Sequence, residues 1–99
     1  MQVNDAQTLV LYALAAGPLH GYAINAAIEE LTGERLGAGS LYGALTRLEA
    51  KQLVEALEEQ GRQRPFRLTP AGRTELQVQL EGMAKLAATG LRRLKLGPV

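Results

Sequence analysis

Between residues 60 and 74 the chain carries a run of arginines and no acidic side chain; the arginines are Arg62, Arg64, Arg67 and Arg73. Guanidinium groups recognise phosphate oxygens by their charge and by paired hydrogen bonds. The whole chain has a net charge of +1, which is too small for a general electrostatic attraction to nucleic acid. A phosphate-binding function would therefore need a focused basic patch, and this segment is where we expect it.

A second set of polar groups that can bond to phosphates or bases follows Gly39: Ser40, Tyr42, Thr46 and Arg47. On the opposite side of a helix, leucines recur at the i, i+4 and i+7 spacing of a buried face: Leu41, Leu45 and Leu48. The polar side chains should then point outward. The hydroxyl of Ser40, in the first turn, could hold a phosphate together with free backbone amides.

From the sequence we expect that the protein is not an enzyme. His20 is the single histidine and the chain has no cysteine, and no motif near His20 supplies the orienting acid or nucleophile that a catalytic histidine needs. We therefore expect His20 to be structural, at the start of a helix. No metal-ligand cluster or phosphate-cradling glycine loop is present in the sequence, so we expect no metal and no cofactor.

The chain also lacks the features of an exported or membrane protein. Its first residues have no basic stretch followed by an apolar core, and no apolar run approaches the roughly 20 residues that span a bilayer. The absence of cysteine fits a reducing compartment. We expect a soluble, cytoplasmic protein without membrane contacts.

Apolar spacing and turn residues predict three short helices. The first covers about residues 5–16, with Asn4 and Gln7 spaced as a capping pair, and ends at Gly17 and Pro18. The second runs from Gly21 to Gly33; it should bury Ile24, Ala27, Ile28 and Leu31 and expose Asn25, Glu29 and Glu30. The third begins within residues 37–40 and carries the leucine face described above.

A β-hairpin is expected next, from short alternating segments at residues 53–57 and 65–68 with a polar, Gly-bearing loop between them. Pro65 has no amide donor, so its segment should be an edge strand or should pair on one side only at that point. Arg62 and Arg64 would flank the tip of the hairpin, where they serve either as phosphate contacts or as solubilising charge. Glu58 and Glu59 should face outward from its base, because carboxylates repel a phosphate backbone.

Thr69 and Pro70 predict the start of a long helix over about residues 70–95. Its apolar positions alternate steps of four and three, with Leu86 and Leu91 widening the stripe; they are Leu76, Leu80, Met83, Ala87, Gly90 and Leu94. A stripe this long exceeds what a small domain can cover. We therefore predict that this helix forms a homodimer contact rather than packing only on its own domain.

This order of elements is typical of a winged helix-turn-helix fold, mainly α-helical with a small β-hairpin, in which the third helix enters the major groove and the hairpin forms the wing. We expect a DNA-binding domain over residues 5–69 and a C-terminal dimerisation helix over residues 70–95. The base-facing candidates are Ser40, Thr46 and Arg47. Tyr22 and Tyr42 could contact phosphates through their hydroxyls, or could pack their rings on the domain with only the tip in water.

Three segments also resemble a known family: Leu19 to Tyr22, Gly39 to Glu49 and Phe66 to Arg73. In this order they resemble PadR-type transcriptional regulators of the subgroup with a short C-terminal region. The resemblance covers roughly residues 8–75 and implies a homodimer that binds a palindromic operator in double-stranded DNA, usually as a repressor. Phe66 stands where the family commonly has an aromatic residue with a hydroxyl.

Two other readings remain open at this point. The winged helix could serve as a protein-interaction or ligand-sensing module that does not bind DNA itself. The resemblance also allows a small-molecule effector, although the chain has no Trp and only four aromatic residues from which to build a stacking pocket. Arg67 and Arg73 could pair with Glu55 or Glu75 instead of binding phosphate.

Overall fold

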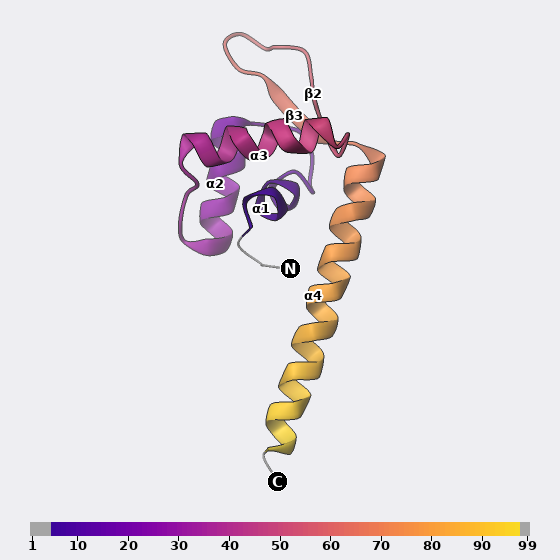
Figure 1. The fold of residues 1–99 in the computed structure, drawn as a ribbon. Helices are drawn as coiled ribbons and strands as arrows, with labels where there is room; N and C mark the ends of the chain where they lie inside the picture. Colours follow the sequence, from indigo (N-terminus) through magenta and orange to yellow (C-terminus); the bar gives the residue numbers. More distant parts are fainter. Residues whose placement is uncertain (1–4, 98–99) are drawn as a thin grey trace.

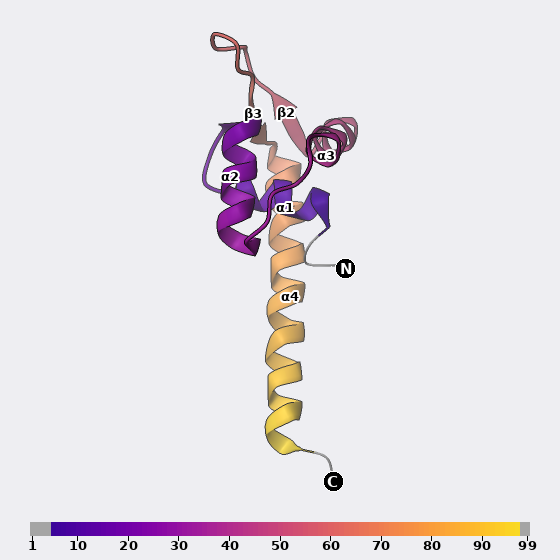
Figure 2. The same cartoon turned by 90° about the vertical axis from the view of Figure 1, so that its left-hand side faces the viewer.

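The computed structural model describes residues 5–97, and within that range it contains four helices and three strands (Figure 1). In chain order they are α1 (Ala6–Ala13), β1 (Leu19–His20), α2 (Gly21–Thr32), α3 (Ala38–Ala50), β2 (Val54–Ala56), β3 (Pro65–Leu68) and α4 (Pro70–Leu96). The first three helices pack together, the β2–β3 hairpin extends from one end of them, and α4 leaves the domain (Figures 1 and 2). The predicted winged helix-turn-helix fold is confirmed.

α1 is shorter than the predicted helix over residues 5–16, since it ends at Ala13. Beyond that point the backbone tightens: the Leu14 amide donates to the Leu11 carbonyl at 3.2 Å, and the Ala15 amide donates to the Tyr12 carbonyl at 3.1 Å. Bonds of this i to i−3 type are common where an α-helix ends. The helix begins after Asp5, and Asn4, the predicted cap, lies outside the described residues.

α2 ends where the sequence predicts, because Gly33 adopts a left-handed conformation with φ of 82° and its amide donates to the Glu29 carbonyl at 2.8 Å. Ile28 is buried as expected, but Leu31 is 47% exposed, so its assignment to the buried face is wrong. Leu31 lies in the last turn of α2, one turn beyond Ile28, and is only partly covered there.

Asn25 is half-buried rather than exposed, and it holds the α2–α3 connection in place. Its Nδ2 donates to the Leu36 carbonyl and its Oδ1 accepts from the Leu36 amide, both at 2.8 Å. These two bonds satisfy both backbone groups of Leu36, so the connection has a fixed path. Asn25 therefore sets where α3 begins relative to α2.

The sheet has the strand order β1–β3–β2, with both pairs antiparallel. The sequence predicts two strands and misses β1, because a two-residue strand has no periodicity. Of the two alternatives predicted for Pro65, the edge strand is wrong, since β3 is central. Proline is tolerated there because its carbonyl accepts a bond from the Leu57 amide at 2.8 Å, and only the return bond from a proline N–H is lost.

The core lies between α1, α2, α3 and the sheet, and α1 packs against all three other helices. Its most deeply buried large side chains are Val10, Leu11, Leu14, Ile24, Ile28, Leu45, Leu48 and Val54. The three leucines predicted on α3 are all buried, as are Phe66 and Leu68 of β3. The core is therefore built from the predicted apolar faces, with α1 at its centre.

α4 is capped and anchored at its first turn. The Thr69 hydroxyl accepts from the Gly72 amide at 3.0 Å, and Pro70 occupies the first helical position. The Leu53 carbonyl lies against Gly72 and also accepts from the Thr69 amide at 3.1 Å. A side chain at position 72 would overlap that carbonyl oxygen, so only glycine lets the helix approach the end of α3 this closely.

Beyond its first turns α4 projects from the domain (Figures 1 and 2). The Cα radius of gyration is 15.6 Å and the molecule measures 61 × 27 × 20 Å, whereas a compact chain of 100 residues has a radius of gyration of about 13 Å. Within residues 5–97 no helix combines the length and hydrophobicity required to cross a membrane. The rest of the domain does not pack against the projecting part of α4 (Figures 1 and 2).

Candidate nucleic-acid interface

The outward face of α3 carries the polar residues that the sequence singles out. Ser40, Thr46 and Arg47 are all exposed, while the leucines on the opposite face are buried. The N-cap residue Gly37 makes no side-chain capping bond, so the first amides of the helix remain available to a ligand. This face is open to an incoming partner along its full length.

Two of these side chains are held by α3 itself. The Thr46 hydroxyl donates to the Tyr42 carbonyl at 2.9 Å, which leaves its oxygen free to accept a bond from outside. The Arg47 side chain runs back along the helix, so that its Nη1 would lie 3.1 Å from a Cβ placed on Gly43. Gly43 thus makes room for the guanidinium to lie flat on the exposed face.

The wing ends in a two-residue turn at Gly61 and Arg62. The Gln60 amide donates to the Gln63 carbonyl at 2.7 Å, and the Gln63 amide donates back to the Gln60 carbonyl at 3.1 Å. Gly61 has φ of 64° and Arg62 has a negative φ, which is the pattern of a type II′ hairpin turn with glycine first. Arg62 therefore stands at the tip of the wing.

Arg64 lies closer to the base of the wing. Leu57 lies opposite Pro65 in the hairpin. Because proline has no N–H, the Leu57 carbonyl receives no backbone hydrogen bond from position 65. Nη1 of Arg64 lies 3.5 Å from that carbonyl oxygen, a long contact that orients the side chain toward the hairpin without neutralising its charge. Both wing arginines are exposed and remain able to bind an anion.

A hollow of about 350 Å³ brings these groups together with the start of α2 and with α3. Its walls include four residues predicted to bind DNA: Tyr22, Tyr42, Arg62 and Arg64. The other lining residues are His20, Gly21, Glu59, Gln63 and Phe66. Ser40, Thr46 and Arg47 lie outside it on α3. The structure therefore gathers two tyrosine hydroxyls and two guanidinium groups from three separate elements.

Glu59 also lines this hollow, so the prediction that it faces outward is wrong. Ala56 opposes Phe66 in the sheet and Gln60 opposes Gln63 in the wing, which means one strand has an extra residue between these two pairs. A bulge of this kind turns the following side chains to the other face. Glu59 therefore lies across the ribbon from Arg64, on the same face.

Tyr42 packs onto the start of α2. Its hydroxyl oxygen would lie 2.5 Å from a Cβ placed on Gly21, and its ring carbon Cζ would lie 3.1 Å away. Tyr42 as a whole is 53% exposed. Gly21 therefore permits the position of Tyr42, a contact between distant segments that the sequence does not signal.

Tyr22 stands on the same side and is 70% exposed. Its ring lies between two neighbours: the His20 ring at a centroid distance of 6.5 Å and the Arg35 guanidinium carbon at 5.2 Å from the ring centroid. Arg35 also pairs with Glu29, whose Oε1 accepts from Nε at 2.9 Å. Neither Gly21 nor Arg35 is among the predicted functional residues, and no local sequence pattern identifies them.

The two other arginines of the basic segment, Arg67 and Arg73, lie outside the hollow that Arg62 and Arg64 line. Arg67 forms an ion pair with Glu55 across the β2–β3 pair, as one of the sequence alternatives proposes. Arg73, in the first turn of α4, has no ion pair among the described residues. The charge of Arg67 is thus balanced within the sheet, whereas the charges of Arg62 and Arg64 are not balanced by an ion pair in the described chain.

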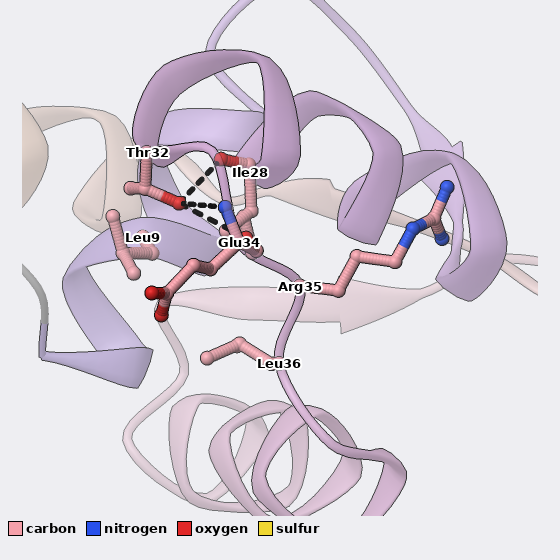
Figure 3. A pocket seen from close by; sticks show the side chains of 6 residues that line it. All are labelled: Leu9, Ile28, Thr32, Glu34, Arg35 and Leu36. Atoms are coloured by element: carbon pink, nitrogen blue, oxygen red, sulfur yellow. Dashed lines mark hydrogen bonds between the residues drawn. The ribbon is translucent and has the colours of Figure 1, made fainter.

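A second hollow, of about 380 Å³, lies between α1 and the end of α2 (Figure 3). The Thr32 hydroxyl on its wall is already engaged, because it accepts from the Glu34 amide at 3.1 Å and can donate to the Ile28 carbonyl at 3.0 Å. Leu9 and Leu36 contribute apolar walls. This hydroxyl therefore stabilises the end of α2, and it is already bonded on both its donor and its acceptor sides.

The apolar stripe of α4 divides into two parts. Leu76 is 4% exposed and belongs to the core of its own domain, so it is not available to a partner. Met83 is half-buried, and Leu80, Ala87, Gly90 and Leu94 are exposed. Leu94 reaches 79% exposure, and Leu86 and Leu91 beside the stripe are also exposed. The free part of the stripe thus begins at Leu80.

Comparison with protein families gives a match to the model described as "Transcriptional regulator PadR-like family" over residues 10–78. A curated protein of similar sequence is an uncharacterized 37.1 kDa protein in transposon TN4556 of Streptomyces fradiae, 71% identical over 87 residues. The match covers 88% of this chain and 25% of that protein. The chain therefore spans about a quarter of the length of this relative.

Solved structures share the fold. RosR from H. salinarum, grown from NaBr, is 31% identical with a TM-score of 0.73, and the match covers 85% of this chain and 79% of RosR. PadR of Bacillus subtilis, in complex with operator DNA, is 23% identical with a TM-score of 0.68, and the match covers 81% of this chain and 48% of PadR. The arrangement of α1 to α4 around the wing is thus common to these proteins.

Proposed function

Because this chain belongs to the PadR-like family of transcriptional regulators, we propose that it binds double-stranded DNA in a sequence-specific manner. The observation that carries the proposal is the hollow between α2, α3 and the wing, which is lined by two tyrosines and by two arginines that form no ion pair among the described residues. Hydroxyl and guanidinium groups are the usual partners of phosphate oxygens in protein–DNA contacts. The solved complex of Bacillus subtilis PadR with operator DNA supports the same use of this fold.

In this proposal α3 lies in the major groove. Ser40, Thr46 and Arg47 face the groove, with Arg47 able to bond to guanine and Thr46 able to accept from or contact a base. Tyr22, Tyr42, Arg62 and Arg64 bind the backbone on either side and set the register. The residues that read bases and those that hold phosphates thus come from different elements.

We further propose that the protein acts as a homodimer on a palindromic operator, as a repressor. The exposed stripe of α4 from Leu80 to Leu94 supports the dimer, because an isolated chain would leave it in water. Two-fold symmetry of the protein requires two-fold symmetry of the site. Residues 5–69 would form the DNA-binding domain, completed by the first turns of α4, and the rest of α4 would join the protomers. The resemblance to PadR-type regulators supports repression.

Replacing Arg64 by alanine should weaken binding to all DNA sequences by about 100-fold, because it removes one charged phosphate contact from each protomer of the proposed dimer. The slope of log affinity against log salt concentration should fall by about 1.8, which is about 0.9 for the phosphate contact of each protomer. Fluorescence anisotropy with labelled duplexes over a salt series measures both quantities.

Arg67→Ala is the matched control, since that guanidinium is already paired with Glu55 and its loss should leave the slope unchanged. A change at Thr46 or Arg47 should instead alter which operator is preferred. Binding of the wild-type protein that does not weaken as salt rises would favour the interaction-module alternative, because an apolar interface releases no counterions.

Gly21→Ala should lower DNA affinity by about 10- to 100-fold, the worth of one hydrogen bond to a charged group, while leaving the fold intact. The new methyl group displaces the exposed end of the Tyr42 side chain rather than any backbone atom. Anisotropy and thermal unfolding measure the two effects. The same change made in a Tyr42→Ala background should cost nothing further, and an additive loss would show that Gly21 acts by another route.

A further inference from the structure

Arg35 directs its charged group at an aromatic ring rather than into the hollow that its backbone borders. Figure 3 shows the side chain extending away from Leu9, Glu34 and Leu36. At its far end the guanidinium carbon lies 5.2 Å from the centroid of the Tyr22 ring, and Nε donates to Glu29 at 2.9 Å. The ion pair with Glu29 favours the position of the guanidinium over the ring.

This contact restrains a side chain that would otherwise be free. Tyr22 is 70% exposed and lies in the first turn of α2, with the His20 ring and the Arg35 guanidinium beside its ring. The His20 ring stacks beside it with an interplanar angle of 26°, and the Arg35 guanidinium lies over the Tyr22 ring. A side chain that is ordered before binding loses less entropy on binding than one that is free.

We infer that Arg35 is a positioning residue for the DNA contact made by Tyr22, an inference that rests on the proposed function. Arg35 comes from the α2–α3 connection and is absent from the walls of the DNA-facing hollow. It therefore acts through the tyrosine ring.

The charge of Arg35 argues against a direct phosphate contact. Its guanidinium is paired with the Glu29 carboxylate, so the pair presents no net positive charge to an approaching backbone. Arg62 and Arg64 have no such partner among the described residues. Loss of Arg35 should thus remove no counterion release from the binding reaction, in contrast to loss of Arg64.

The test is a double-mutant cycle of Arg35→Ala and Tyr22→Ala on full-length protein, measured as affinity for a labelled duplex over a salt series. Arg35→Ala alone should weaken binding by about 3- to 10-fold, the cost of ordering one freed side chain. The salt slope should stay at its wild-type value. In the Tyr22→Ala background the same change should have no further effect, because nothing remains to be positioned.

Arg92→Ala is the matched control, since it removes an exposed arginine near the far end of α4 and should change neither affinity nor slope. A fall in salt slope on Arg35→Ala, or a loss that persists in the Tyr22→Ala background, would overturn the inference and make Arg35 a direct contact. An unchanged affinity would overturn it as well. If the wild-type protein binds no duplex at low salt, the proposed DNA-binding function fails. This result differs from the failures of the Arg35 inference, in all of which the wild-type protein still binds DNA.

Discussion

Replacing Gly72 by alanine is expected to lower the thermal unfolding temperature of the protein by roughly 12 °C or more, the shift that a loss of about 3 kcal/mol produces in a domain of this size. The added Cβ would overlap the Leu53 carbonyl oxygen and lie 2.8 Å from the Leu53 carbonyl carbon. That carbonyl is held by its bond from the Thr69 amide, so it cannot move aside without losing the start of α4. An added group in a well-packed core costs about 1–3 kcal/mol of stability, and we expect a clash with a fixed backbone atom to reach the upper end of that range.

The sign of this result is informative, because helix propensity alone predicts the opposite. Alanine is about 1 kcal/mol better than glycine within a helix. Gly39→Ala is a suitable control, since Gly39 is helical and a Cβ there meets no atom within 4 Å. The control should unfold at or slightly above the wild-type temperature. Circular dichroism melts of the three proteins compare them, and an unchanged melting temperature for Gly72→Ala would show that α4 is not anchored at this carbonyl.

Leu94→Asp should convert the protein from a dimer to a monomer at micromolar concentration. Leu94 is 79% exposed in the protomer, so the change costs the isolated chain little, but in a paired stripe it would bury a carboxylate from each copy. An unpaired buried charge costs several kcal/mol, which weakens the dimer by at least about 100-fold. Leu80→Asp and Met83→Asp should act in the same direction.

Sedimentation velocity distinguishes the two states. Ala88→Asp, which adds the same charge on the opposite side of α4, should remain dimeric and serves as the control. Operator affinity of Leu94→Asp should fall by about 100-fold or more, because two half-sites are no longer held by one molecule. A Leu94→Asp protein that stays dimeric would place the contact between protomers on another surface.

Most of the fold could be predicted from the sequence because its signals are local. Three features depend only on residues that are close together in the chain. They are the leucine spacing of α3, the start of α4 at Thr69 and Pro70, and the glycine that ends α2. The two hairpin strands also follow from short-range alternation. These features need no knowledge of what packs against them.

The features that were missed depend on contacts between distant segments. β1 exists because β3 offers it a free edge, and its two residues carry no pattern of their own. Pro65 is central because β1 pairs with β3 on the other side. Leu31 is 47% exposed although helical periodicity places it on the same face as Ile28, because burial depends on where the neighbouring elements lie.

The candidate site shows the same division. Tyr22, Tyr42, Arg62 and Arg64 could be chosen by residue type, yet only the folded chain places them around one hollow. Arg35 could not be chosen from the sequence, because its contact with Tyr22 depends on the path of the α2–α3 connection. The register shift that brings Glu59 into the hollow is likewise invisible in a pattern of alternating residues.

The most direct test of the central claim is selection of random-sequence duplex DNA by the purified protein, with sequencing of the recovered pool at low salt and again at higher salt. A dimeric DNA-binding regulator should recover a two-fold symmetric motif with half-sites about one helical turn apart. Total recovery should fall steeply as salt rises. A pool that matches the input at low salt would contradict the claim and direct attention to protein partners of the wing and of α4.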